Sequence, residues 1–165
     1  MTIKNLIVYY SFEGSSRLIA ENIAKVLDAD VLECKPVKDL KSKGFSKYFW
    51  GGRQVLFNKK PVLEKFEKNP TDYYFIVIGT PVWSYNYSPA IRSFLSLIRL
   101  KDKKIALFCC HEGGIGKTLD NLKSELSENK IIDEMDFKNV AKNKEENILK
   151  AKKWAQSLVD KINMK

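Results

Sequence analysis

The sequence predicts an α/β protein built on a three-layer, doubly wound, five-stranded parallel sheet in the strand order 2-1-3-4-5. Strand-like and helix-like patterns alternate along all 165 residues. Such alternation predicts parallel strands with helices on both faces, because right-handed crossovers place the helices there. The run at residues 73–79 is apolar throughout, as in a strand buried on both faces, and residues 104–110 predict another buried strand. We find no repeat and no linker, and therefore expect a single domain over residues 1–165.

The first half of the chain begins with an apolar run at residues 3–10, interrupted only by Lys4 and Asn5, which predicts the first strand. A polar turn at residues 11–16 ends this strand, and a helix with one apolar face follows at once. Residues 29–34 predict a shorter second strand, which Pro36 ends. The alternation of polar and apolar side chains along it is typical of an edge strand.

Residues 37–72 are the least regular part of the sequence, and we expect an irregular insertion there that is rich in aromatic side chains. Within it, residues 46–57 predict a short helix that is interrupted at Gly51 and Gly52. The aromatic side chains of this insertion are expected to be buried against another part of the protein or a ligand, because their exposure to water is unfavourable. The insertion therefore either packs as a flap on the edge of the sheet or helps to wall a ligand site.

The second half continues the alternation after the strand at residues 73–79. Ser88 predicts a helix N-cap, and Pro89 then takes the first helical position, where proline is favoured. The remaining predicted elements are, in order, a strand at residues 104–110, a helix at about 117–126, a strand within 131–137 and an amphipathic helix at 144–162.

The net charge of +9 permits binding to an acidic partner, to nucleic acid or to a phosphate ligand. Lysine and glutamate alternate as on solvated faces, however, and the sequence has no arginine-rich run, so we expect no nucleic-acid partner. No run approaches the ~20 apolar residues of a membrane helix. The start of the chain predicts a strand rather than a signal peptide, so we expect a soluble cytoplasmic protein.

The three cysteines, Cys34, Cys109 and Cys110, argue against a disulfide framework, because their number is odd and two are adjacent. Cys109, Cys110 and His111 are consecutive, but neighbours on a strand point to opposite faces and cannot easily share one metal ion. A catalytic thiol would also need a third, orienting group, and none is evident. We therefore expect buried strand cysteines, no metal site and no catalytic residue.

The polar turn at residues 11–16 lies between a strand and a helix, an arrangement that builds an anion site. The free N–H groups of the helix start, the positive end of its dipole and the hydroxyls of Ser11, Ser15 and Ser16 act together there. Gly14 would let the backbone approach a ligand closely. The alternative is a plain N-cap, in which Ser15 or Ser16 closes a helix that binds nothing.

Loops at the carboxyl ends of the first, third and fourth strands converge in a sheet of this order. They are the serine turn at residues 11–16, an aromatic loop at 83–87 and a glycine-rich loop at 111–116. A phosphate cradle beside aromatic side chains suits a flat, phosphorylated ligand, and flavin mononucleotide (FMN) fits that description. Trp83 or Tyr85 would stack on the ring, unless both merely cover a loop. The expected cofactor-binding residues are Ser11, Glu13, Gly14, Ser15, Ser16, Pro81, Val82, Trp83, Ser84, Tyr85, His111, Gly113 and Gly114.

From end to end, the sequence resembles the flavodoxin family. Residues 9–16 (YYSFEGSS) resemble the phosphate loop of the family, residues 79–83 (GTPVW) its second flavin loop, and residues 109–114 (CCHEGG) take the place of its third. The resemblance implies a doubly wound fold, noncovalently bound FMN, and one- and two-electron redox work. The expected function is to carry electrons between a reductase and an acceptor.

Three features depart from the usual pattern of the family. Glu13 stands where a hydroxyl is usual, and we expect its side chain to point outward because a carboxylate repels phosphate. The usual tyrosine of the third loop is missing, and His111 is the nearest ring. Electron-carrier flavodoxins are typically acidic, whereas this chain carries a charge of +9. The partner is therefore either a redox protein or a small-molecule acceptor, and an FMN-dependent oxidoreductase that acts on NAD(P)H or quinones stays open.

Two further alternatives stay open. Residues 111–118 match the phosphate loop of a nucleotidase, G-x-x-x-x-G-K-[ST], except that His111 replaces the first glycine. That site would leave the serine turn without a role, and no apolar strand ends in a magnesium-binding aspartate. The other alternative is a flavin-free binding module of the same fold, which would recognise an acidic partner through its positive surface.

Overall fold

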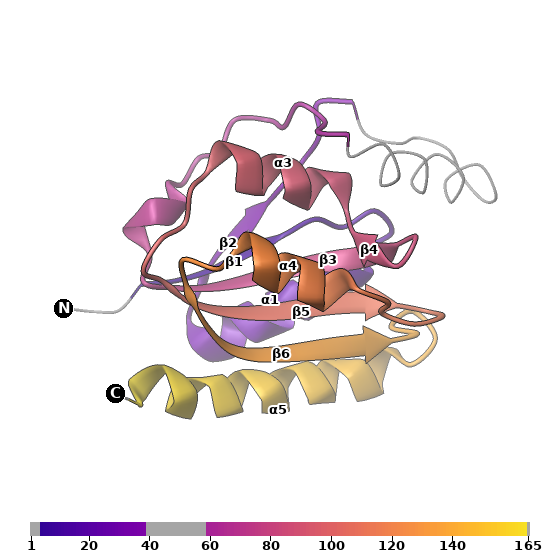
Figure 1. Ribbon diagram of the computed structural model, residues 1–165. Coiled ribbons are helices and arrows are strands. Elements are labelled where there is room, and N and C mark those ends of the chain that lie inside the picture. The colour runs from indigo at the N-terminus through magenta and orange to yellow at the C-terminus, as the bar shows by residue number, and fades with distance from the viewer. Residues whose placement is uncertain (1–3, 39–58, 165) are drawn as a thin grey trace.

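The sheet is parallel along its main path and has the predicted strand order. The computed structural model describes residues 4–38 and 59–164 (Figure 1). Each strand of the path β2-β1-β3-β5-β6 runs parallel to its neighbours. In that order the strands are β2 (Asp30–Glu33), β1 (Asn5–Tyr9), β3 (Phe75–Trp83), β5 (Lys104–His111) and β6 (Lys130–Lys138). Counted along the chain, these five strands give the predicted order 2-1-3-4-5.

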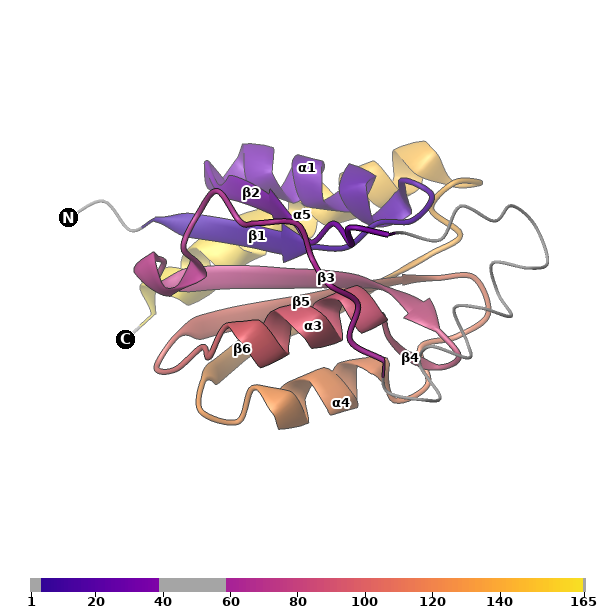
Figure 2. The same cartoon turned by 90° about the horizontal axis from the view of Figure 1, so that it is seen from above.

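Helices cover both faces of the sheet, which confirms the three-layer arrangement. Figure 2 shows α1 (Ser15–Leu27) and α5 (Lys144–Asn163) on one face, and α3 (Pro89–Leu97) and α4 (Thr118–Glu125) on the other. A short 3-10 helix, Pro70–Asp72, precedes β3. As the sequence predicted, Ser88 caps α3: its Oγ accepts a hydrogen bond from the N–H of Ile91 at 3.4 Å.

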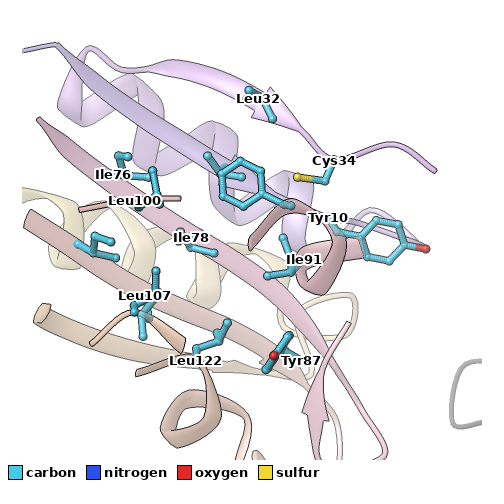
Figure 3. Close-up of a cluster of buried hydrophobic side chains, with 14 of the residues drawn as sticks. Tyr10, Leu32, Cys34, Ile76, Ile78, Tyr87, Ile91, Leu100, Leu107 and Leu122 are labelled. Carbon is cyan, nitrogen blue, oxygen red and sulfur yellow. The ribbon is translucent and has the colours of Figure 1, made fainter. Parts of the chain in front are cut away.

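Each face of the sheet has its own apolar core because successive side chains of a strand point to opposite faces. On the face of α3 and α4, Ile76, Ile78 and Leu107 pack against helix residues such as Ile91 and Leu122 (Figure 3). The face of α1 and α5 buries a second cluster that includes Val77, Phe108 and Trp154. The central strands are therefore buried on both sides, as their continuous apolar runs predicted.

A sixth strand, which the sequence analysis did not predict, extends the sheet beside the site. The third strand does not end at Gly79 but continues to Trp83, and β4 (Asn86–Tyr87) pairs with it antiparallel. The tight turn between them holds Ser84 and Tyr85 at φ values of 49° and 60°. Hairpin turns of this kind are usually signalled by Asn-Gly or Asp-Gly, and this one lacks that signal.

The described part of the expected insertion returns along the edge of the sheet. Just beyond β2, the N–H of Val37 donates to the carbonyl of Val62 at 2.8 Å, and that of Glu64 donates to the carbonyl of Lys35 at 2.7 Å. Leu63 is buried in the core on the α3 side. This part pairs with residues 35–37, just beyond the end of β2. The helix expected at 46–57, with its aromatic side chains, lies outside the described residues.

In the described part of the chain, no helix combines the length and the apolar character that crossing a bilayer requires.

Candidate functional site

A pocket opens at the carboxyl ends of β1, β3 and β5, where loops are expected to converge in this fold. Every residue expected at the site lines this pocket except Gly14, which is the N-cap of α1. The additional lining residues are Phe12, Cys110, Glu112, Val140 and Ala141. The structure thus brings the three predicted loops together around one cavity, and none of its lining residues comes from the described part of the insertion.

The turn from β1 into α1 leaves the start of the helix open to a ligand. Gly14 takes a φ of 101°, which a residue with a side chain rarely adopts, and α1 has no side-chain cap. The hydroxyl of Ser11 instead accepts a hydrogen bond from the N–H of Gly14 at 3.1 Å. The first turn of α1 has no acidic residue and its N–H groups have no partner within the helix. The expected cap at Ser15 or Ser16 is therefore wrong, because Gly14 is the N-cap and no side chain caps the helix.

Ser16 provides the strongest sign that this turn binds something. Only 1% of the residue is exposed, and its Oγ makes no hydrogen bond of good geometry with the described residues; its neighbour is the Cys110 thiol, and sulfur is a weak hydrogen-bond partner. A buried polar atom without a partner costs about 1–3 kcal/mol. Because Ser16 lines the pocket at the positive end of α1, an anionic ligand there would satisfy the hydroxyl. Glu13 is exposed, which agrees with a side chain that points outward.

Two aromatic residues of the second loop line the pocket in different ways. Trp83 is held by edge-to-face packing, with ring centroids 5.6 Å from Tyr10 and 5.8 Å from Phe12. Tyr85, at the tip of the β3–β4 hairpin, is 69% exposed. Trp83 is thus a fixed wall, and Tyr85 has a ring free to cover a flat ligand.

The third loop brings the only histidine of the chain to the pocket. His111 is the last residue of β5, and its Nε2 lies 2.7 Å from Oδ2 of Asp136 on β6. The hydrogen bond with His111 is the main cause that lowers the pKa of the Asp136 carboxyl. Nδ1 of the same ring is buried and has no hydrogen-bond partner among the described residues.

Cys110 also lines the pocket, but its chemistry is that of a buried side chain. The residue is 5% exposed, and burial raises the pKa of its thiol to about 12. The thiolate, which is the reactive form, is therefore scarce at neutral pH. No cluster of three or more metal-ligating side chains exists within residues 4–38 and 59–164.

Sequence reasoning missed Val140 and Ala141, which reach the pocket from the connection between β6 and α5. It also missed Asp136, which contacts the site only through His111. None of the three belongs to a motif. In this fold the connection after the last strand also starts at the carboxyl edge of the sheet. That rule would have pointed to Val140 and Ala141.

The comparisons with known proteins assign the chain to a family. A family model described as flavodoxin matches residues 4–158, and the protein belongs to that family. No curated protein matches the sequence.

Several solved structures share the fold. A flavoprotein in complex with FMN from Lactobacillus acidophilus NCFM is 22% identical, with a TM-score of 0.71 over 87% of this chain and 98% of that one. A flavoprotein from Bacteroides uniformis ATCC 8492 is 18% identical, with a TM-score of 0.78 over 93% and 97%. Oxidised Flavodoxin 2 from Bacillus cereus is 18% identical, with a TM-score of 0.61 over 96% and 99%. At these identities the likeness concerns the fold.

Proposed function

We propose that the pocket binds FMN noncovalently and that the protein carries electrons between a reductase and an acceptor. The observation that supports a phosphorylated ligand is the hydroxyl of Ser16, which is buried at the start of α1 with only the Cys110 thiol beside it, in a pocket that also has aromatic walls. The family membership and a structural neighbour in complex with FMN support the choice of ligand. When bound, FMN supplies the redox chemistry, and the protein sets its position and surroundings.

The residues of the site fit this group. The hydroxyls of Ser15 and Ser16 and the first N–H groups of α1 would hold the phosphate without a cationic side chain. Trp83 and Tyr85 would flank the ring and exclude water from it. The glycine-rich loop after His111 would contact the polar edge of the ring through its backbone.

A titration of the apoprotein with FMN and with riboflavin tests the proposal. We expect the flavin fluorescence to be quenched at a one-to-one ratio, and FMN to bind more tightly than riboflavin because only FMN has the phosphate. A colourless protein that ignores both flavins would contradict the proposal and would favour the flavin-free binding module.

The charge of +9 favours a second candidate, an FMN-dependent oxidoreductase that acts on NAD(P)H or quinones, because carriers of this family are typically acidic. Oxidation of NADH or NADPH by the FMN-loaded protein, measured with a quinone as acceptor, separates the two. Steady turnover supports the oxidoreductase, and its absence supports the carrier. We also keep the cytoplasm as the proposed location, since Cys34, Cys109 and Cys110 are all free.

A further inference from the structure

The pairing of His111 with Asp136 is a feature of the tertiary structure. In the β5–β6 register, Cys109 lies opposite Asp136 and His111 lies opposite Lys138. His111 and Asp136 are therefore diagonal neighbours on one face of the sheet. The imidazole is 7% exposed and the carboxylate 44%, so one partner is inside the site and the other reaches solvent.

The geometry fixes the tautomer of the imidazole. An ionised carboxylate only accepts hydrogen bonds, so the 2.7 Å contact requires hydrogen on Nε2 of His111. In the neutral ring, Nδ1 is then a bare acceptor. Nδ1 is buried without a hydrogen-bond partner in the described part of the chain, so a second proton there would lack an acceptor until a ligand provides one.

A second proton on His111 would add a positive charge to a pocket that has few in the part of the chain that the structure describes. Among the described residues that line it, none is a lysine or an arginine, and the two acidic residues, Glu13 and Glu112, are both exposed. His111 is the one lining residue that becomes positive by taking up a proton. The described lysine and arginine side chains thus lie outside the wall of the site. A positive charge in that wall would stabilise an anionic ligand.

Other charged groups near the pair do not replace this charge. On β6, Lys138 lies opposite His111, and it is exposed. On α5, the Nζ of Lys150 donates to the backbone carbonyl of Asp136 at 2.6 Å. Glu134, further back on β6, is paired with Lys123 of α4 at 2.9 Å. The direct partner of the imidazole is Asp136.

We propose that Asp136 and His111 form a proton-binding pair that adds a positive charge to the wall of the site when an anionic ligand fills it. Asp136 is the positioning residue: it orients the ring and stabilises the imidazolium. On binding, Nδ1 takes up one proton from solvent: an N–H bond forms on the ring, an O–H bond of hydronium breaks to leave water, and no electrons are transferred. The inference rests on the proposed function, since FMN is the ligand. By linkage, the proton and the ligand each tighten the binding of the other by the same factor.

The first experiment measures FMN affinity between pH 5 and pH 8 for the wild type and three variants. The phosphate of FMN titrates in this range as well, and His111→Gln keeps that contribution while it removes the imidazole. We expect the affinity of the wild type to rise on acidification by about tenfold more than that of His111→Gln, the equivalent of one pKa unit. Asp136→Asn keeps an acceptor for Nε2 but removes the charge, and should lose most of this rise. Glu134→Gln, a matched loss of one carboxylate on the same strand, should keep it.

The second experiment follows the proton directly. His111 is the only histidine, so its Cε1–H signal in an NMR spectrum needs no assignment strategy. We expect this signal to titrate at a higher pH in the FMN-loaded protein than in the apoprotein.

The outcomes separate this inference from the proposed function. If FMN binds but the imidazole signal titrates at the same pH with and without it, the proton-binding pair is wrong and the proposed function stands. A wild-type pH dependence equal to that of His111→Gln would also overturn the pair. If no FMN binds at any pH, the proposed function itself fails, and the inference fails with it.

Discussion

Tyr85 and Gly116 are in direct contact, which locks the second loop of the site to the third. The N–H of Lys117 donates to the carbonyl of Tyr85 at 3.1 Å. A Cβ atom added to Gly116 would lie 2.4 Å from the Cβ of Tyr85. Both residues have positive φ values, 60° for Tyr85 and 51° for Gly116. The backbone position of Tyr85, which lines the pocket, therefore depends on a glycine in another loop.

Gly116→Ala should destabilise the apoprotein by about 1–3 kcal/mol, because alanine is strained at this φ and its methyl group would overlap Tyr85. The measurement is the free energy of unfolding in urea. Gly113→Ala is the matched control in the same loop, because nothing lies within 4 Å of its added Cβ. Equal stabilities of the two variants would show that the loops are not locked in this way.

Ser16→Ala should weaken FMN binding by about tenfold and riboflavin binding much less, since a hydrogen bond to a charged group is worth about 1.5–3 kcal/mol. Isothermal titration of both ligands measures the difference. Ser96→Ala, on the exposed side of α3, serves as a control that should change neither affinity. Equal losses for the two flavins would mean that the serine turn does not hold the phosphate.

Trp83→Ala should weaken FMN binding and brighten the fluorescence of the flavin that remains bound, because a ring that flanks the cofactor quenches it. Tyr85→Ala should brighten it as well. Tyr85→Ala should lower the stability of the protein less than Trp83→Ala does, since Trp83 packs on Tyr10 and Phe12 whereas Tyr85 is exposed. Steady-state fluorescence and thermal unfolding check the two effects. Unchanged FMN affinity and flavin fluorescence in both variants would show that Trp83 and Tyr85 do not contact the flavin ring.

The three thiols should resist a disulfide reagent in the folded protein at pH 8 and react on unfolding. All three cysteines are buried, and burial raises the pKa of each thiol, that of Cys110 to about 12. The reaction is expected to be slow in the folded protein because the nucleophile is the thiolate, which is scarce at a pH below the raised pKa of the thiol. Absorbance of the released reagent in native buffer and in denaturant measures the difference. Rapid reaction of a thiol in native buffer would contradict the burial seen here.

The sequence by itself determined the order of the elements, the parallel sheet and the three loops of the site. These features depend on local patterns: continuous apolar runs for buried strands, one apolar face for helices, and Ser88 followed by Pro89 for the start of α3. Because the carboxyl ends of parallel strands share one edge, local patterns were enough to bring the loops together.

Only the tertiary structure decided which side chains meet at that edge. The register of β5 and β6 shifts between Ile105 and Ala106. Without this shift, the pairing of Ile105 with Ile131 would continue to place Met135 opposite Cys109, whereas the structure places Asp136 there. A shift of one residue reverses which face a side chain points to, so it brings the carboxylate beside His111. The register and the burial of the Ser16 hydroxyl depend on contacts between distant segments, which no local pattern encodes. The β4 hairpin is local, but its turn lacks the usual glycine signal.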